Sequence, residues 1–164
     1  MRHSSIREGI VAGFLGATAI AVWFIIVDVV SGHPLYTPDL LGRGLISVLG
    51  KPPAMPDTMI THVFAYTLFH YAAFALVGVV VASIVHQSAR TPAVLAGFLI
   101  MFVVFELGAY GLAGLLTQSE LGGLAWYQIF IANLLASVVM GWFMWTRHPA
   151  LKHDISVALT GEDA

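Results

Sequence analysis

The sequence predicts an all-helical integral membrane protein: a bundle of four transmembrane helices with a short amphipathic helix in the first outer loop. Hydrophobic residues make up 59% of the 164 residues, charged residues only 10%, and the mean hydropathy is +0.87. Soluble domains carry roughly a quarter charged residues. Because so few charges cannot cover a surface that faces water, lipid must surround most of this chain.

Four long apolar runs set the number of predicted spans. Each exceeds the roughly 20 residues that a helix needs to cross a hydrocarbon core about 30 Å thick, and none has the polar stripe of a soluble helix. The only acids within them are Asp28 and Glu106. The first run also exceeds the roughly 7–15 apolar residues of a signal peptide, which favours a span over a cleaved leader. The predicted spans cover approximately residues 9–30, 59–85, 92–117 and 122–146, in a single transmembrane domain over 1–164 with a tail at 147–164.

The connection between the first two spans is long and carries its own helix signal. Thr37-Pro38-Asp39 is typical of a helix start, with Thr37 as the N-cap and proline in the first position. The apolar positions over 40–49 then fit a short amphipathic helix on the outer membrane surface, which Gly50-Lys51-Pro52-Pro53 would end. An irregular loop is the alternative, because two glycines inside the segment weaken a helix.

The basic residues predict that both termini are cytoplasmic. Cytoplasmic connections carry an excess of lysine and arginine. Only Arg43 and Lys51 lie in the connections predicted to be outside. The connections and tails predicted to be inside hold five basic residues: Arg2, Arg7, Arg90, Arg147 and Lys152. Tryptophans and a tyrosine at both ends of the last span suit the two interfacial aromatic belts; they are Trp126, Tyr127, Trp142 and Trp145.

Several activities are excluded or unsupported. The absence of cysteine excludes disulfides, thiolate metal sites and c-type haem attachment. The net charge of −2 does not indicate a nucleic-acid partner. No predicted span contains the lysine that a retinal Schiff base needs. The metalloprotease, serine-hydrolase and P-loop motifs are missing, so nothing in the sequence argues for an enzyme. The sequence leaves the question of a cofactor open.

Small residues recur every four positions in two of the predicted spans. Gly9, Gly13 and Ala17 form one strip, and Asn133, Ser137 and Gly141 form another. In lipid, such strips let helix backbones approach closely. They indicate either assembly of the bundle within one chain or a homo-oligomer, and the sequence leaves both open. Four spans are few for a monomeric transporter, so a transport function would predict an oligomer or other membrane subunits.

Polar side chains on three different spans fall at one predicted depth. Counting about 1.5 Å per residue from the outer ends, His70, Glu106 and Asn133 each lie about 16 Å deep. Ionisable groups at that depth are costly and usually face partners inside a bundle. The simplest arrangement pairs Glu106 with His70, and Asn133 completes the hydrogen bonds. Nearer the outer surface the sequence places four further polar residues: Tyr66, Tyr110, His62 and Asp28.

Three functional interpretations follow from this polar layer. The first is an intramembrane site, formed by the seven residues above, that binds or passes a proton, an ion or a small solute. The second is a non-catalytic accessory or assembly subunit, in which the layer only fixes helix register. The third is a haem or metal-binding redox protein with His62, His70 and Glu106 as ligands. The two histidines lie about 12 Å apart along one helix, too far to share an ion.

Two segments carry a resemblance. Residues 6–13 read IREGIVAG, and residues 32–42 read GHPLYTPDLLG. Together they resemble a set of uncharacterised small bacterial four-helix inner-membrane proteins over roughly the first quarter of the chain. The resemblance implies a bacterial inner-membrane location and no particular function, so no site residue is assigned from it.

Overall fold

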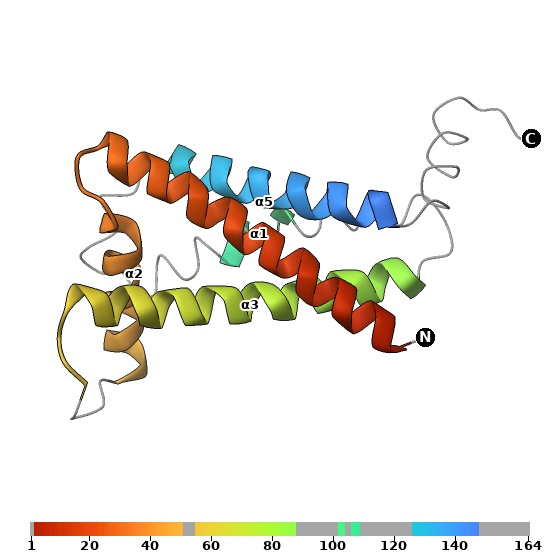
Figure 1. Ribbon diagram of the computed structural model, residues 1–164, viewed down its shortest axis with the longest axis horizontal. Helices are drawn as coiled ribbons and strands as arrows, with labels where there is room; N and C mark the ends of the chain where they lie inside the picture. Colours follow the sequence, from red (N-terminus) through yellow and green to blue (C-terminus); the bar gives the residue numbers. More distant parts are fainter. Residues whose placement is uncertain (1, 51–54, 88–101, 104–105, 109–125, 148–164) are drawn as a thin grey trace, which may run out of the picture.

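A computed structural model describes residues 2–50, 55–87, 102–103, 106–108 and 126–147 of the chain (Figure 1). The described residues confirm an all-helical protein with helices fit to cross a membrane. Three helices are long and apolar enough to do so, over Ser5–Val30, Met59–Ser83 and Trp126–Arg147. The predicted span over 92–117 falls mainly outside the described residues.

The three long helices follow the apolar runs, and α1 and α3 continue past them at one end. Helix α1 covers Arg2–Val30 and ends at the predicted residue; α3 covers Met59–Gln87 and begins at the predicted residue; α5 covers Trp126–Arg147. Hydropathy marks only the part of a helix that lies in hydrocarbon. The backbone hydrogen bonds of a helix can continue into the polar headgroup region, so α1 and α3 run longer than their apolar runs. The predicted start of the last span, at residue 122, falls outside the described residues.

The predicted helix in the first connection is present as α2, over Tyr36–Leu49. Its predicted N-cap was wrong. The cap is Leu35, which has φ 65° and no side-chain capping bond, and Thr37 lies inside the first turn. The physical reason is that the polar group at this helix start comes from another helix, the carboxylate of Asp28 on α1. Gly50, with φ 83°, ends the helix where the sequence predicted.

Glycines bring α1 and α3 into backbone contact. A Cβ placed on Gly13 would lie 2.1 Å from the carbonyl oxygen of Phe74, and one on Gly78 would lie 2.1 Å from the carbonyl oxygen of Gly9. Only glycine fits at such an approach. The strip that begins at Gly9 is therefore used within this chain, between α1 and α3.

Helix α1 also packs on α5, and these two helices are antiparallel. The indole N–H of Trp23, late in α1, donates to the carbonyl of Gln128, early in α5, at 3.0 Å. Farther along the pair, Gly16 faces the side chain of Met140. The glycine contacts show that α1 is antiparallel to α3, and the contacts of Trp23 and Gly16 show that it is antiparallel to α5. Helices α3 and α5 therefore run parallel to each other (Figure 1).

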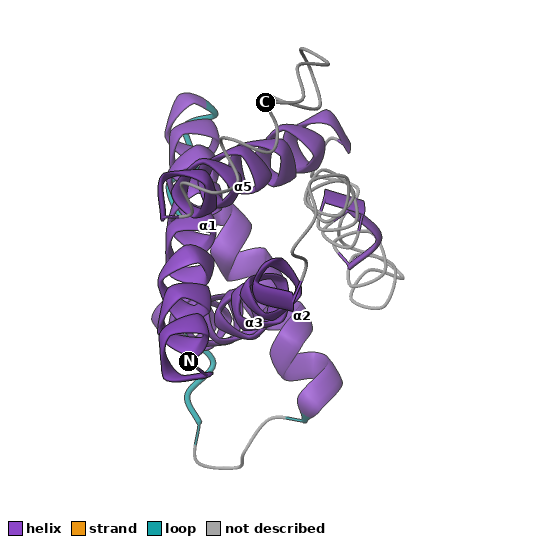
Figure 2. Ribbon diagram, turned by 90° about the vertical axis from the view of Figure 1, so that its right-hand side faces the viewer, coloured by secondary structure: helices purple, strands orange, loops and turns teal. Residues whose placement is uncertain are grey.

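Helix α2 crosses one end of the bundle. It lies transverse to the long helices at the end where α1 finishes and α3 and α5 begin, which we call the α2 end (Figures 1 and 2). It packs mainly on α3: a Cβ on Gly42 would lie 2.1 Å from the carbonyl oxygen of His62. This close contact places the polar side chains of α2 beside the start of α3.

The core between the long helices is small and apolar, while the outward faces carry large apolar side chains. One face of α3 exposes residues at intervals of four, as expected for a helix surrounded by lipid; they include Ile60, Phe64, Leu68, Leu76 and Val80. The core is built mainly of alanines, aromatics and methionines: Ala12, Ala17, Ile20, Phe24, Phe74, Val81, Ala82, Ala132, Ala136, Met140 and Met144.

Candidate functional site

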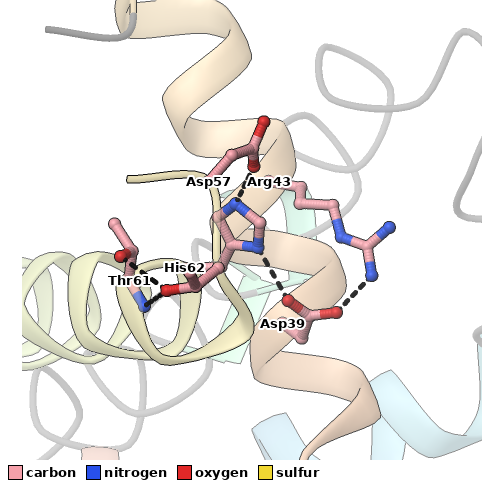
Figure 3. A network of polar contacts seen from close by, with 6 residues as sticks. Asp39, Arg43, Asp57, Thr61 and His62 are labelled. Atoms are coloured by element: carbon pink, nitrogen blue, oxygen red, sulfur yellow. Dashed lines mark hydrogen bonds and ion pairs between the residues drawn. The ribbon is translucent and has the colours of Figure 1, made fainter. Parts of the chain in front are cut away.

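A histidine held between two carboxylates is the centre of the most polar part of the described structure (Figure 3). His62, in the first turn of α3, is only 6% exposed. Its Nδ1 lies 2.8 Å from Oδ1 of Asp39 on α2, and its Nε2 lies 2.9 Å from Oδ1 of Asp57, just before α3. Arg43, one turn along α2, donates to the other oxygen of Asp39. We call Asp39, Arg43, Asp57 and His62 the His62 cluster.

The hydrogen bonds of His62 define its proton count. An ionised carboxylate can only accept, and a neutral imidazole has one N–H donor and one acceptor nitrogen. With both ring nitrogens facing carboxylates, the arrangement is complete only when both nitrogens carry hydrogen. The ring is then an imidazolium, and its two bonds are charge-assisted. The geometry of the cluster therefore corresponds to a histidine that has taken up a proton.

The surroundings of Asp39 favour the ionised form of its carboxyl group. Its burial acts to raise the pKa of the carboxyl, but the hydrogen bonds and positive charges of Arg43 and His62 outweigh burial and hold the pKa below its usual value. A salt bridge to an exposed arginine contributes little by itself. The buried contact to His62 is the one that joins α2 to α3.

Local structure holds the cluster in place. Gly42 brings the backbones of α2 and α3 together beside His62, and any side chain there would push α2 away. At the start of α3, the hydroxyl of Thr58 accepts from the backbone N–H of Thr61 at 3.3 Å, the usual role of a threonine at a helix start. This fixes the turn that carries Asp57 and His62.

Asp28 provides a second polar link at the α2 end. The side chain is 3% exposed, and its two oxygens accept from Thr37, from the backbone N–H at 2.8 Å and from the hydroxyl at 2.7 Å. The carboxylate thus satisfies a free N–H at the start of α2, where negative charge is favourable. Asp28 lies in the last turn of α1, and its partner is the first turn of α2.

His70 is bonded to α1. Its Nε2 donates to the carbonyl oxygen of Ala17 at 3.1 Å, and its ring stacks on Tyr66 and packs against Phe74. The sequence predicted a pair between His70 and Glu106; among the described residues the hydrogen bond of His70 goes instead to the α1 backbone. The reason is that Ala17 is small enough to let a bulky ring reach the carbonyl beneath it, which the pattern of polar residues alone does not reveal.

Glu106 and Asn133 do lie together. The amide of Asn133 donates to Oε1 of Glu106 at 3.2 Å, so this part of the predicted arrangement is present. Tyr110, also predicted for the site, lies outside the described residues. The six predicted residues that the structure describes are therefore divided among separate contacts.

Sequence reasoning missed three members of the site. Asp39, Arg43 and Asp57 lie in the connection between the first two predicted spans, whereas the predicted site held only residues inside the spans. Asp39 and Arg43 stand four apart on a predicted helix, which is the spacing of a helical ion pair. That spacing was the available signal, whereas the meeting with His62 depends on how α2 docks.

The metal-binding interpretation receives no support from the described residues. Within them, no group of three or more histidine or acidic side chains is arranged to hold a metal ion. Both ring nitrogens of His62 already face carboxylates. Comparison with protein families, with curated proteins and with solved structures found no match.

Proposed function

We propose that this chain is a bacterial inner-membrane protein with four spans and cytoplasmic termini, which binds a proton at its outward end through His62. The fourth crossing is supported by the direction of the described helices. Gln87 ends α3 at one end of the bundle and Trp126 begins α5 at the other. A fourth span over 92–117 would join these two ends.

The orientation is supported by the distribution of charge between the two ends. The start of α1 and the last turns of α3 and α5 lie at the end opposite α2. The basic residues near that end, Arg2, Arg7 and Arg147 among them, favour the cytoplasm. The His62 cluster then faces the outside, where it exchanges protons with the external medium.

The single observation that carries the proton-binding function is the pair of contacts from His62 to Asp39 and Asp57, at 2.8 and 2.9 Å. Histidine is the side chain that ordinarily changes charge between about pH 5 and pH 8. A buried histidine with two carboxylate partners has a definite structural use for the proton. Tyr66 and His70 lie on the same face of α3 as His62, farther along the helix. They have no transport role in the proposed function.

The experiment is a titration of His62 itself. Protein labelled with 15N-histidine in lipid vesicles is followed by solid-state NMR between about pH 5 and pH 9, with His62→Gln used to assign the signal. We expect both ring nitrogens of His62 to carry hydrogen at the acidic end and one at the alkaline end. A ring that keeps a single protonation state over the whole range overturns the proposal.

A second function is favoured by a different observation: the deep polar side chains on the described helices have hydrogen-bond partners inside the bundle. His70 bonds to Ala17, and Asn133 bonds to Glu106, as in a clasp that only fixes helix register. An accessory or assembly subunit needs no more than this. The double variant Glu106→Gln, His70→Phe is the test. If the double variant inserts and folds as well as wild type and the host phenotype is unaltered, the deep residues do not form a functional site. A folded double variant with an altered host phenotype would overturn the accessory-subunit interpretation.

A further inference from the structure

The two carboxylates that hold His62 differ in their access to water. The side chain of His62 is 8% exposed, that of Asp39 is 10% exposed, and that of Asp57 is 71% exposed. Asp39 faces Nδ1 of the ring, and Asp57 faces Nε2 (Figure 3). Each ring nitrogen therefore faces a carboxylate, and of these two carboxylates the one at Nε2 is open to water.

The ring nitrogen on the buried side should keep its hydrogen. Oδ1 of Asp39 accepts from Nδ1 at 2.8 Å, and Oδ2 accepts from Arg43. A neutral ring with hydrogen only on Nε2 would turn the lone pair of Nδ1 toward the buried carboxylate and deprive Oδ1 of its donor. An unpaired buried acceptor is costly, and a charged one more so.

The ring nitrogen on the exposed side can lose its hydrogen at a smaller cost. Without that hydrogen, the lone pair of Nε2 faces Oδ1 of Asp57 at 2.9 Å. Because the Asp57 side chain is exposed, water can form the hydrogen bonds that its carboxylate then lacks. Nε2 is therefore the nitrogen whose hydrogen should come and go.

The contact between Asp57 and His62 is made within one turn of the chain. The backbone N–H of His62 donates to the carbonyl of Thr58 at 3.1 Å, and the hydroxyl of Thr58 accepts from the backbone N–H of Thr61. These bonds fix the start of α3 and so hold Asp57 beside Nε2. How α2 docks does not enter this contact.

We propose that Asp57 is the group through which His62 exchanges its proton with external water, and that Nε2 is the ring nitrogen that gains and loses this proton. On uptake, the carboxylate of Asp57 accepts a proton from a hydronium ion. The resulting carboxyl O–H passes that proton to the lone pair of Nε2, which leaves an imidazolium beside a carboxylate. Release follows the same steps in reverse. This Asp57 route rests on the proposed proton site and adds how the proton reaches it.

Other charged or titratable side chains lie at or near this contact on α1, α2 and α3: Asp28, Asp39, Arg43 and Tyr66. Asp28 is 3% exposed and accepts from Thr37. Arg43 stays protonated, and Tyr66 stacks on His70, farther along α3. The first turn of α5 contains no acid. Among the described residues, Asp57 is thus the exposed carboxylate in contact with His62.

Solid-state NMR of 15N-histidine protein in lipid vesicles tests which nitrogen titrates. We expect Nδ1 of His62 to keep its hydrogen from about pH 5 to pH 9, and Nε2 to lose it. At the alkaline end, the Nδ1–H form should outnumber the Nε2–H form by about tenfold or more, because the alternative leaves a buried acceptor unpaired. Asp39→Asn should reverse this preference. Its amide can accept from Arg43 and donate to Nδ1, so that Nε2 carries the hydrogen and donates to Asp57.

The rate of proton exchange tests the route itself. Near the midpoint of the titration, the broadening of the 15N signals gives the lifetime of the hydrogen on Nε2. In Asp57→Asn, the amide can still form a hydrogen bond with Nε2 but cannot carry a proton, so this lifetime should lengthen about 100-fold, the lower end of the effect of a positioned proton-transfer group. Asp57→Glu, which keeps a carboxyl group, should recover most of the rate.

The failures of the Asp57 route and of the proton site are separable in these measurements. If His62 titrates by losing hydrogen from Nδ1, or if its exchange is as fast in Asp57→Asn as in wild type, the route is wrong and the proton site stands. Exchange that is equally slow in Asp57→Asn and Asp57→Glu also overturns the route, because a carboxyl group at this position would then not carry the proton. If His62 keeps one protonation state over the whole pH range, the proton site is wrong, and the route falls with it.

Discussion

The carboxylate of Asp28, in the last turn of α1, accepts both the backbone N–H and the hydroxyl of Thr37, in the first turn of α2. The Asp28 side chain thereby links the end of α1 to the start of α2 and provides hydrogen-bond acceptors for the first turn of α2. Both residues are buried. An unsatisfied carboxylate in this position would be costly, so the contact should contribute measurably to stability.

Replacing Thr37 by valine should destabilise the protein, because it removes one of the two hydrogen bonds to a buried carboxylate while keeping the shape of the side chain. We expect a loss of about 1–3 kcal/mol in the free energy of unfolding, measured by denaturation in detergent micelles. Thr67→Val is the matched control, since the hydroxyl of Thr67 bonds only to Val63 of its own helix. Equal losses in the two variants would show that the Asp28 contact contributes nothing special.

Alanine at Gly78 should disrupt the contact between α1 and α3. The added methyl would meet the carbonyl oxygen of Gly9 at 2.1 Å, and forced overpacking typically costs about 1–3 kcal/mol. At Gly108 a Cβ meets no atom of the described residues within 4 Å, so Gly108→Ala should be neutral or should stabilise the helix by up to about 1 kcal/mol. The unfolding temperature should thus fall in Gly78→Ala and should stay the same or rise in Gly108→Ala. A shift of the same sign in both would contradict the close approach.

The effects of mutations on stability should be coupled for Asn133 and Glu106 and additive for His70 and Glu106. In a double-mutant cycle, Asn133→Leu and Glu106→Leu should show a coupling of about 0.6 kcal/mol or more, typical of a hydrogen bond between helices in a membrane. His70→Phe and Glu106→Leu should be additive, because the hydrogen bond of His70 goes to Ala17. Unfolding in mixed micelles provides the measurement. Strong coupling between His70 and Glu106 would restore the pairing expected from the sequence.

Acid should weaken the α2 contact by protonating Asp39. Burial acts to raise the pKa of this carboxyl, but Arg43 and His62 hold it below its usual value. A carboxyl with a lowered pKa stabilises the folded state above its ordinary value, near pH 4, and loses that contribution as pH falls through the lowered value. As the pH falls below about 4, the difference in unfolding free energy between wild type and Asp39→Asn should therefore shrink.

Arg43→Gln provides the control for this acid response. Without the arginine, one cause of the lowered pKa is removed, so the stability contributed by Asp39 should be lost at a higher pH than in wild type. If the difference between wild type and Asp39→Asn is the same at every pH, Asp39 does not bind α3 as a carboxylate.

Much of the fold could be predicted because lipid imposes a simple rule. In hydrocarbon, only helices and closed barrels provide hydrogen bonds for every backbone N–H and C=O group. The apolar runs over 9–30 and 59–85 therefore had to be helices. Their composition identified them without any knowledge of contacts. The helix α2 was also predictable, from its proline and its apolar spacing, although its first residue was not.

The candidate site was predictable only in part. His62 and Asp28 were identified as polar residues near the outer surface, because depth follows directly from helix rise. The partners of His62 were not, since Asp39 and Asp57 lie outside the spans and meet it through a turn and a crossing helix. Likewise, the sequence does not reveal which backbone carbonyl His70 bonds to, because every residue has a carbonyl group.

The sequence by itself determined that this protein is helical, that its long helices belong in a membrane and that its polar side chains are few. Those properties depend on composition and on local periodicity, and each segment expresses them without reference to the others. Only the tertiary structure decided that α2 lies across the end of the bundle, that Gly42 lets it reach α3, and that His62 stands between Asp39 and Asp57. A hydrogen bond between distant segments depends on distances of a few ångströms, and these are set by how helices pack.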